Sequence, residues 1–166
     1  MPSSVDIIGR SFFGVLAMTS SDSYKFDIRL ATSISDFLFL RRLRNQVRDQ
    51  MTNSTAPVGY WRQFRFYLNK PPNVKVYVAW IDAKRAGYLL LRQESTSCFI
   101  TEAVDERFRK SGVATGLVRF AQECCADLTA EILLTNTASI KLHQSTGFQC
   151  CGDDGRIAIY RFRRAR

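Results

Sequence analysis

The sequence predicts an α/β fold of the α+β type, in which a mixed, mostly antiparallel central sheet is flanked by about four helices. Its 166 residues, 46% of them hydrophobic, are enough for one substantial core and too few for two. Apolar residues recur with a period of two in some segments and near 3.6 in others. The resulting order is strand, two helices, three strands, helix, strand, helix and two strands. An antiparallel meander that leads into alternating strands and helices indicates a mixed sheet covered by helices.

The first predicted elements are a strand over 24–31 and a helix over 36–51. The strand alternates between polar and apolar residues, and Ser33 and Ser35 provide N-caps for the helix. The apolar faces consist of Phe26, Ile28 and Leu30 in the strand and of Phe37, Leu40, Leu43 and Val47 in the helix.

A second helix over 58–69 carries five aromatic residues and ends before two prolines, which do not continue a helix. Three strands are predicted to follow, over 74–81, 87–92 and 97–104, because these runs are apolar and contain few charges. The turn between the first two is expected at 82–85.

The C-terminal half alternates between helix and strand. An amphipathic pattern predicts a helix over 112–126, a short apolar run predicts a strand over 131–135, and a second helix is expected over 138–145. Two closing strands are predicted over 148–151 and 157–162.

The chain is expected to form one domain over 23–166, preceded by a flexible N-terminal extension over 1–22 whose end is rich in Ser and Thr. The five cysteines are odd in number and lack metal-finger spacing, so neither a disulfide framework nor a metal site is predicted. No run approaches the ~20 apolar residues of a membrane span. We therefore expect a cytoplasmic protein without membrane contact, as a monomer or a homodimer.

The charge is strongly basic, with 24 Lys and Arg against 15 Asp and Glu. Such a balance favours polyanionic ligands, which include a coenzyme, a nucleotide sugar and a nucleic acid. A basic surface that serves only solubility explains the composition equally well.

A candidate phosphate site follows the strand over 97–104. Small residues and unpaired amides at the start of the next helix favour an anion, as do the positive end of the helix dipole and the neighbouring cationic side chains. An ordinary helix start has the same appearance on this evidence alone. The segment consists of Arg109, Lys110, Ser111, Gly112, Val113, Ala114 and Thr115.

A second motif about twenty residues later contains Asn136, Ser139, Gly147 and Phe148. Together with Arg109, Gly112 and Ala114 of the first segment, it resembles the two motifs of the GNAT superfamily of N-acetyltransferases. The predicted order of elements from Tyr24 onward agrees with the fold of that family. The sequence is therefore similar to a family of single-domain enzymes that use acetyl-CoA as co-substrate.

The resemblance implies splayed central strands, with a gap between the strands over 97–104 and 131–135 that receives the pantetheine arm. Main-chain groups near Glu102 and Val104 would bind this arm, and donors there stabilise the oxyanion of acyl transfer. The segment over 109–115 would bind the pyrophosphate, and Asn136 would contact the coenzyme near its arm.

Acyl transfer to an amine requires proton transfer from the amine and to the leaving thiolate. The family often has a Tyr where this chain has His143, its only histidine, so His143 is a candidate proton donor, although a lone helical His is often structural. Glu102 is the candidate base, with a salt-bridged strand carboxylate as the alternative. Direct attack with catalysis by positioning is compatible with either outcome.

The acceptor is expected to be a small amine bound by the first two helices, with Arg44, Tyr60 and Trp61 as binding residues. Arginine binds acidic groups, and aromatic rings stack on bases or sugars. The Leu-Arg-Asn turn over 43–45 resembles the branch that acetylates nucleotide-linked amino sugars. A basic helix face with core aromatics is the structural alternative. A protein N-terminus, a nucleic-acid amine and a non-catalytic acyl-CoA-binding module remain open as other functions.

Overall fold

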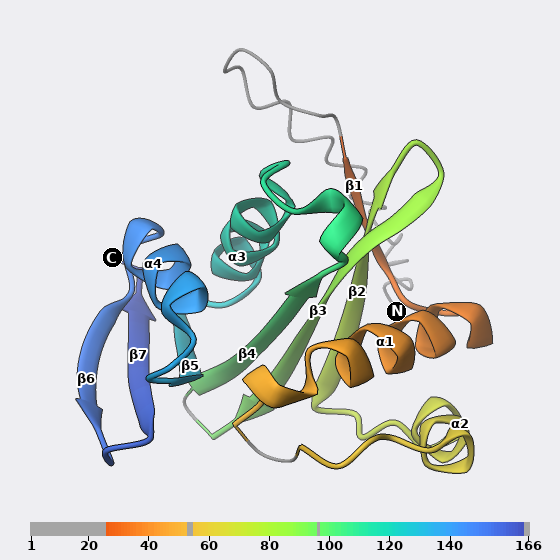
Figure 1. Cartoon of the computed structure of the whole chain (residues 1–166), viewed down its shortest axis with the longest axis horizontal. Coiled ribbons are helices and arrows are strands. Elements are labelled where there is room, and N and C mark those ends of the chain that lie inside the picture. Colours follow the sequence, from red (N-terminus) through yellow and green to blue (C-terminus); the bar gives the residue numbers. More distant parts are fainter. Residues whose placement is uncertain (1–25, 53–54, 96, 165–166) are drawn as a thin grey trace, which may run out of the picture.

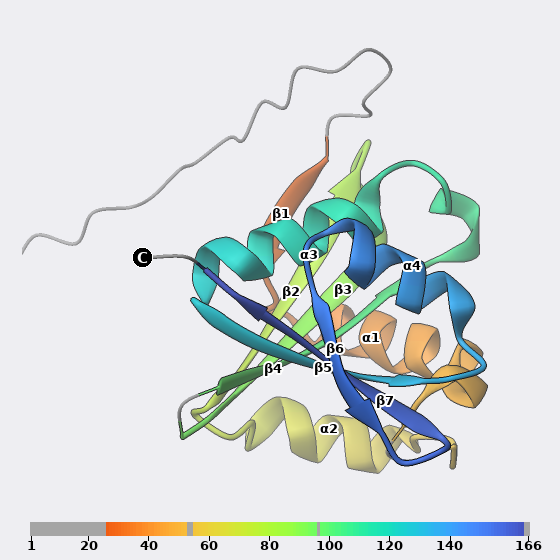
Figure 2. The same ribbon diagram turned by 90° about the vertical axis from the view of Figure 1, so that its left-hand side faces the viewer.

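The computed structural model describes residues 26–52, 55–95 and 97–164. Within them, seven strands form a single mixed sheet of order β1-β2-β3-β4-β5-β7-β6. Helices α1 and α2 cover one face of this sheet, and α3 and α4 cover the other, as Figures 1 and 2 both show. The predicted fold class is confirmed. The predicted N-terminal extension over 1–22 lies outside the described residues.

Strand β1 (Asp27–Leu30) is shorter than predicted, and Leu30 is 53% exposed rather than part of an apolar face. Helix α1 (Ile34–Gln46) begins two residues earlier than predicted because Ser33 forms a capping box with Asp36. It also ends earlier, before a short 3-10 turn η1 (Arg48–Gln50).

Helix α1 packs through its predicted stripe, since Phe37, Leu40, Leu43 and Val47 are all buried. Helix α2 (Tyr60–Leu68) crosses nearby, where Phe66 and Tyr67 contact Phe37 edge-on. Gln63 is the one residue of α2 that is buried, so most of the aromatic side chains of this helix lie at the surface.

The meander consists of β2 (Val74–Ile81), β3 (Lys84–Glu94) and β4 (Ser97–Val104), paired antiparallel. The bounds of β2 and β4 are as predicted, whereas β3 is longer at both ends. The difference arises because the turn uses only Asp82 and Ala83, both with positive φ, as in a two-residue hairpin.

The second half consists of a 3-10 turn η2 (Glu106–Phe108), α3 (Val113–Cys124), β5 (Asp127–Leu133), α4 (Thr137–Ser145), β6 (Gln149–Asp153) and β7 (Ile157–Arg163). Strand β5 begins four residues before the predicted start and ends two residues before the predicted end. Its first residues are fixed by tertiary contacts: Asp127 pairs with Arg163, and Thr129 hydrogen-bonds Ser97.

Two hydrophobic cores lie on the two faces of the sheet. The larger is packed beneath α3 and α4 and includes Leu89, Ile100, Leu117 and Leu128. The smaller lies beneath α1 and includes Phe37, Leu43 and Tyr88. The residues of β4 alternate between these faces, so that neighbouring positions on this strand reach opposite sides of the molecule.

Candidate functional site

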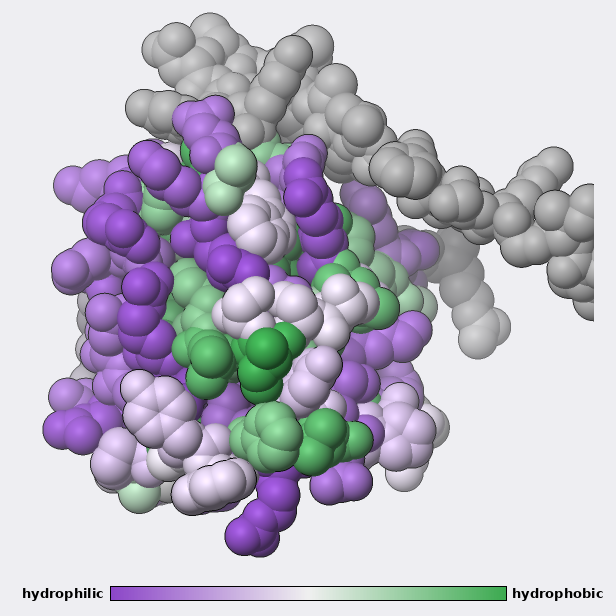
Figure 3. All heavy atoms as spheres, turned by 90° about the vertical axis from the view of Figure 1, so that its right-hand side faces the viewer, coloured by the Kyte–Doolittle hydropathy of each residue, from purple (hydrophilic) through white to green (hydrophobic). Residues whose placement is uncertain are grey.

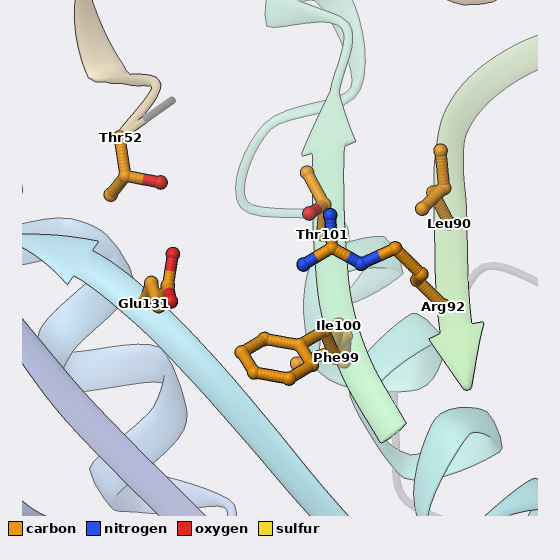
Figure 4. A pocket seen from close by; sticks show the side chains of 7 residues that line it. All are labelled: Thr52, Leu90, Arg92, Phe99, Ile100, Thr101 and Glu131. Atoms are coloured by element: carbon orange, nitrogen blue, oxygen red, sulfur yellow. The ribbon is translucent and has the colours of Figure 1, made fainter. Parts of the chain in front are cut away.

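The centre of the sheet opens between β4 and β5. These parallel strands pair only at Cys98 with Leu128 and at Phe99 with Thr129. Beyond that point they diverge, as Figure 4 shows for the parts that carry Thr101 and Glu131. Residues 100–104 of β4 pair with β3 on one side and have no strand partner in β5 on the other. A free strand edge is therefore available for a ligand that pairs like a strand.

Glu102 lies on the diverging part of β4 and reaches His143 of α4. The distance between Glu102 Oε2 and His143 Nε2 is 3.8 Å, and the two side chains are 10% and 1% exposed. The two predicted catalytic residues are thus neighbours in a nearly closed space on the α3/α4 side of the opening.

The imidazole of His143 is held by its other nitrogen. Nδ1 lies 2.9 Å from the carbonyl oxygen of Ser139, one helical turn earlier. A carbonyl oxygen only accepts, so Nδ1 is the donor of this bond and Nε2 is the ring nitrogen left over. Phe148 contacts the ring edge-on, with centroids 4.8 Å apart. These contacts fix the ring with Nε2 directed at Glu102.

His143 Nε2 is buried and has no hydrogen-bond partner among the described residues. Its distance from Glu102 is too long for a hydrogen bond. A buried polar atom without a partner is rare in proteins and calls for a ligand, a water or a proton-transfer role. Burial raises the pKa of Glu102, and the nearby His143 opposes this shift. A raised pKa in a carboxyl group is a property of proton-transferring side chains.

The segment after β4 is anchored by Asp105, a residue that sequence reasoning missed. Its buried carboxylate accepts two hydrogen bonds from the Arg107 guanidinium at 2.9 Å and one from Arg42 of α1 at 3.1 Å. The bond from Arg107 is the main cause that lowers the pKa of Asp105, and this carboxylate is therefore charged at neutral pH. A single acidic residue directly after an apolar strand was the only available sequence signal.

The predicted phosphate segment follows at the start of α3. Gly112 is the N-cap, with the left-handed φ of 81°, and is exposed. The first intrahelical bond runs from the Gly116 amide to the Gly112 carbonyl, so the three preceding helix amides have no acceptor inside the helix. Arg109 and Lys110 are exposed beside them. The helix start thus presents amides, a dipole end and two cations on one surface.

The two remaining coenzyme residues occupy different positions. Val104 ends β4 and packs partly against the larger core. Asn136 is the N-cap of α4, where its side-chain oxygen accepts from the Ser139 amide at 3.2 Å. This capping role alone explains why the position holds an Asn, and it requires no bound ligand. Both residues flank the opening, one on the β4 side and one just after β5.

A small pocket lies on the opposite face of the same opening (Figure 4). It brings together side chains from β3, β4, β5 and the segment after α1: Thr52, Leu90, Arg92, Phe99, Ile100, Thr101 and Glu131. Sequence reasoning missed these residues. Glu131, a charge within an apolar strand, was the one local signal.

The predicted acceptor residues Arg44, Tyr60 and Trp61 are not among those that line this pocket. Tyr60 and Trp61 are 67% and 78% exposed, and Tyr60 stacks against the guanidinium of Arg41 at 3.6 Å. Arg44 contacts the carbonyl oxygen of Ala56. These three predicted binding residues therefore lie on α1 and α2 outside the lining of the pocket, and their role in acceptor binding stays a prediction.

The exposed apolar side chains of α1 and α2 are Ile34, Leu38, Tyr60, Trp61, Phe64 and Leu68, which we call the α1/α2 patch. Figure 3 looks onto this side of the molecule and shows hydrophobic residues gathered at its centre with hydrophilic residues around them. Apolar groups of this size on a surface mark contact sites more often than isolated exposed residues do.

The described residues contain no group of three or more His, Cys, Asp or Glu side chains that could hold a metal ion. No helix in the described ranges has the length and apolar character needed to cross a bilayer.

The family model described as "Acetyltransferase (GNAT) family" matches residues 40–148, which covers β4, the helix start at Gly112 and His143. Among curated protein sequences, no significant match to the chain is found.

Solved structures share the fold. An N-acetyltransferase from Staphylococcus aureus Mu50 matches with a TM-score of 0.69 at 19% identity over 83% of this chain and 98% of its own. A ribosomal-protein-alanine N-acetyltransferase from Brucella melitensis matches with a TM-score of 0.69 at 22% identity over 82% and 98%. The protein yncA from Salmonella typhimurium, solved with its cofactor acetyl-CoA, matches with a TM-score of 0.68 at 18% identity over 85% and 95%.

Proposed function

Because the chain belongs to the GNAT family of acetyltransferases, we propose that it acetylates the primary amine of a small acidic molecule by direct attack in a ternary complex. The chain is an enzyme that takes its acetyl group from acetyl-CoA and transfers it to an amine. The identity of the acceptor and the roles of individual residues are the subject of the proposal.

The opening between β4 and β5 is the observation that carries the proposal. It provides an unpaired strand edge over 100–104, and the helix start at Gly112 lies at the end of that same strand. A ligand with an amide-containing arm and a diphosphate can pair its arm with this strand edge and place its diphosphate at the helix start. The chemical groups of coenzyme A therefore fit these residues.

We propose that the residues over 109–115 bind the diphosphate. The unpaired amides of Val113, Ala114 and Thr115 are the donors, and Arg109 and Lys110 add charge. Main-chain groups near Glu102 and Val104 bind the pantetheine arm, and Asn136 lies on the far side of the opening. A donor near the thioester oxygen stabilises the negative charge that develops there during attack.

In this mechanism Glu102 accepts a proton and His143 donates one. The raised pKa of Glu102 makes its carboxylate a stronger base than an ordinary one, which suits it to accept a proton from the acceptor ammonium through water. The neutral amine attacks the thioester carbon, the C–S bond breaks, and the leaving thiolate needs a proton. The Nε2 position of His143, which has no partner, is the proton donor in its protonated form.

The nucleotide-linked amino sugar is the acceptor favoured by the Leu-Arg-Asn turn over 43–45 and by the basic character of α1 and α2. Arginine pairs readily with phosphates, and an aromatic ring can stack on a sugar or base. Arg44, Tyr60 and Trp61 would then contact the distant part of such an acceptor, outside the pocket.

One observation favours a second acceptor class. The α1/α2 patch exposes aromatic and aliphatic side chains together, with Arg62 and Arg65 exposed on the same helix. A protein chain that presents its N-terminal amine would bury such a surface better than a small molecule would. A nucleic-acid acceptor would instead give binding that falls steeply with salt.

The test is a thiol-release assay with acetyl-CoA and a panel of amines, combined with mass spectrometry of the products. The panel contains UDP-glucosamine, free glucosamine, amino acids and a peptide with a free N-terminus. A product 42 Da heavier than its amine (from the mass of C2H2O, about 42) and stoichiometric thiol release are expected for a small acidic amine. Binding of acetyl-CoA without release across the whole panel would instead support a non-catalytic module.

A further inference from the structure

The pocket on the α1/α2 side of the opening contains two opposite charges on opposite sides of a gap. Arg92 extends from β3 past β4, and Glu131 projects from β5, with Thr101 between them (Figure 4). Both charged side chains line the same small space. The ion pairs of the described residues do not include one between them.

The register of the sheet explains why these side chains meet. Arg92 is the cross-strand partner of Phe99, and Phe99 pairs with Thr129 at the last point where β4 and β5 touch. Thr101 and Glu131 lie two residues further along their strands and therefore project from the same face. They are the first residues of that face on either side of the opening.

Arg92 is oriented by its neighbours. Its Nε lies 2.8 Å from Glu94 Oε1, and its guanidinium carbon lies 5.0 Å from the centre of the Phe99 ring. Nε makes no hydrogen bond in spite of this short distance, so the contact with Glu94 is an ion pair alone, and the Phe99 ring lies against one face of the guanidinium. Its terminal nitrogens point into the pocket (Figure 4), and a guanidinium presents such donors in pairs that match a carboxylate or a phosphate.

Glu131 is exposed, and its carboxylate makes no hydrogen bond or ion pair with another described residue. In a chain with a formal net charge of +9, the general field repels a cationic amine. An unpaired carboxylate at the opening offsets that repulsion locally. An ammonium group that approaches the thioester from this side would therefore meet Glu131 first.

We propose that Arg92 and Glu131 form the acceptor subsite and select a zwitterionic amine, whose ammonium binds Glu131 and whose carboxylate or phosphate binds Arg92. Two opposite charges held apart across a gap match a ligand that carries the complementary charges at its two ends, and Thr101 and Thr52 add hydroxyl groups to the lining of the same pocket. The assignment rests on the proposed acetyl transfer and specifies its acceptor. Glu102 and His143 lie on the other face, so amine recognition and the buried proton-transfer pair are separated by β4.

The experiment uses pairs of probes that differ only in the anionic group. L-Serine is compared with ethanolamine, and glucosamine 6-phosphate with glucosamine, which distinguishes carboxylate from phosphate as the anion. For each probe, kcat/KM for acetyl transfer is measured, and binding to the complex of the protein with CoA is measured by calorimetry. The variants are Arg92→Gln and Glu131→Gln, with Arg29→Gln on the edge strand β1 and Glu123→Gln on α3 as exposed controls that do not line the pocket.

At least one probe that carries the carboxylate or phosphate is expected to exceed the partner that lacks it by about 10-fold or more in kcat/KM, as loss of a charge-assisted pair implies. Arg92→Gln is expected to remove that preference and to leave kcat/KM of the partner without the anionic group within about twofold. Glu131→Gln is expected to weaken both members of the pair, and the two controls are expected to behave as the parent protein.

Acetyl transfer that is insensitive to both substitutions would overturn the subsite and leave the enzymatic function intact. The same holds if no anionic probe is preferred over its partner. Binding to the CoA complex that depends on Arg92 and Glu131, without turnover of any amine, would support the subsite and refute the proposed acetyl transfer. Absence of such binding for every probe would overturn the subsite whatever the turnover.

Discussion

His143 Nε2 lies 3.8 Å from Glu102 Oε2, and both side chains are almost completely removed from solvent. The pair joins β4 to α4 beside the opening in the sheet, and the ring is held by the carbonyl oxygen of Ser139 through Nδ1. Ser139 holds the ring at Nδ1 through both its carbonyl oxygen and its hydroxyl group, at 2.9 and 3.4 Å. The other nitrogen, Nε2, has no hydrogen-bond partner among the described residues.

The first prediction concerns this nitrogen. His143→Phe is expected to lower kcat by about 10-fold or more, since a single proton-transfer group contributes about that much or more. The affinity for acetyl-CoA is expected to stay within about twofold, because the proposed coenzyme contacts are main-chain groups and the helix start. Steady-state kinetics and calorimetry measure the two quantities.

His143→Tyr is the matched control, because a phenol retains an O–H donor in a ring of similar size. It is expected to keep more activity than the Phe variant. If the Phe variant turns over as fast as the parent protein, His143 has no part in proton transfer.

The second prediction concerns the buried carboxyl of Glu102. Burial raises its pKa in the folded state, so the folded chain binds this proton more tightly than the unfolded chain does. The stability from this group is therefore greatest at acidic pH. It falls as the pH rises from the ordinary carboxyl pKa to the raised one, and is constant above that.

Glu102→Gln removes this ionisation. The Tm of the variant, followed by differential scanning fluorimetry from acidic to mildly alkaline pH, is expected to lose the decline that the parent protein shows. Glu123→Gln, at an exposed position of α3, serves as the control and is expected to track the parent. Parallel Tm curves for parent and Glu102→Gln would contradict the assigned shift.

The third prediction concerns the helix start. Gly112→Glu is expected to abolish acetyl-CoA binding in calorimetry, because it adds bulk and negative charge where the diphosphate is proposed to bind. Gly155→Glu is the control, since Gly155 also has a left-handed φ and open space around it but lies in the β6–β7 turn. Equal loss of binding in both variants would point to unfolding rather than to the phosphate site.

The fourth prediction concerns Asp105. Asp105→Asn is expected to lower the free energy of unfolding by about 2 kcal/mol at neutral pH, the scale of hydrogen bonds to a buried charged group. The pKa of Asp105 is lowered, chiefly by Arg107, so this stabilisation is present at neutral pH. It is lost as the pH falls through the lowered pKa, where parent and variant are expected to converge.

Urea unfolding at neutral and at acidic pH measures this difference. Asp49→Asn is the control, because the 87% exposed Asp49 has only a loose ion pair of 3.7 Å with Arg48, which contributes little. A difference between parent and Asp105→Asn that is independent of pH would show that the charge of Asp105 does not stabilise the fold.

The sequence predicted most accurately those elements whose signals lie within a few consecutive residues. Strand β4 was predicted with its observed bounds, and the Ser33 cap of α1 was identified because a capping serine acts within four residues. Strand β5 was placed too late, because Asp127 and Thr129 interrupt its apolar pattern. Their partners, Arg163 and Ser97, are more than thirty positions away in the sequence and belong to other strands.

Some residues of the candidate site were likewise named from the sequence, whereas others are brought together only by the fold. Glu102, His143 and the residues around Gly112 were named from the sequence through its resemblance to the GNAT motifs, and their roles stay predictions. The pocket residues Arg92 and Glu131 come from strands that are brought together only by the sheet order. No spacing in the chain links them, so a sequence alone offered no reason to pair them.

The binding of the coenzyme in the opening between β4 and β5 is tested most directly by a crystal structure of the protein with acetyl-CoA. We predict the diphosphate within hydrogen-bonding distance of the amides over 112–115, and the thioester between β4 and β5 beside Glu102. Density for the coenzyme elsewhere, or β4 and β5 paired along their whole length with no ligand between them, would contradict the account.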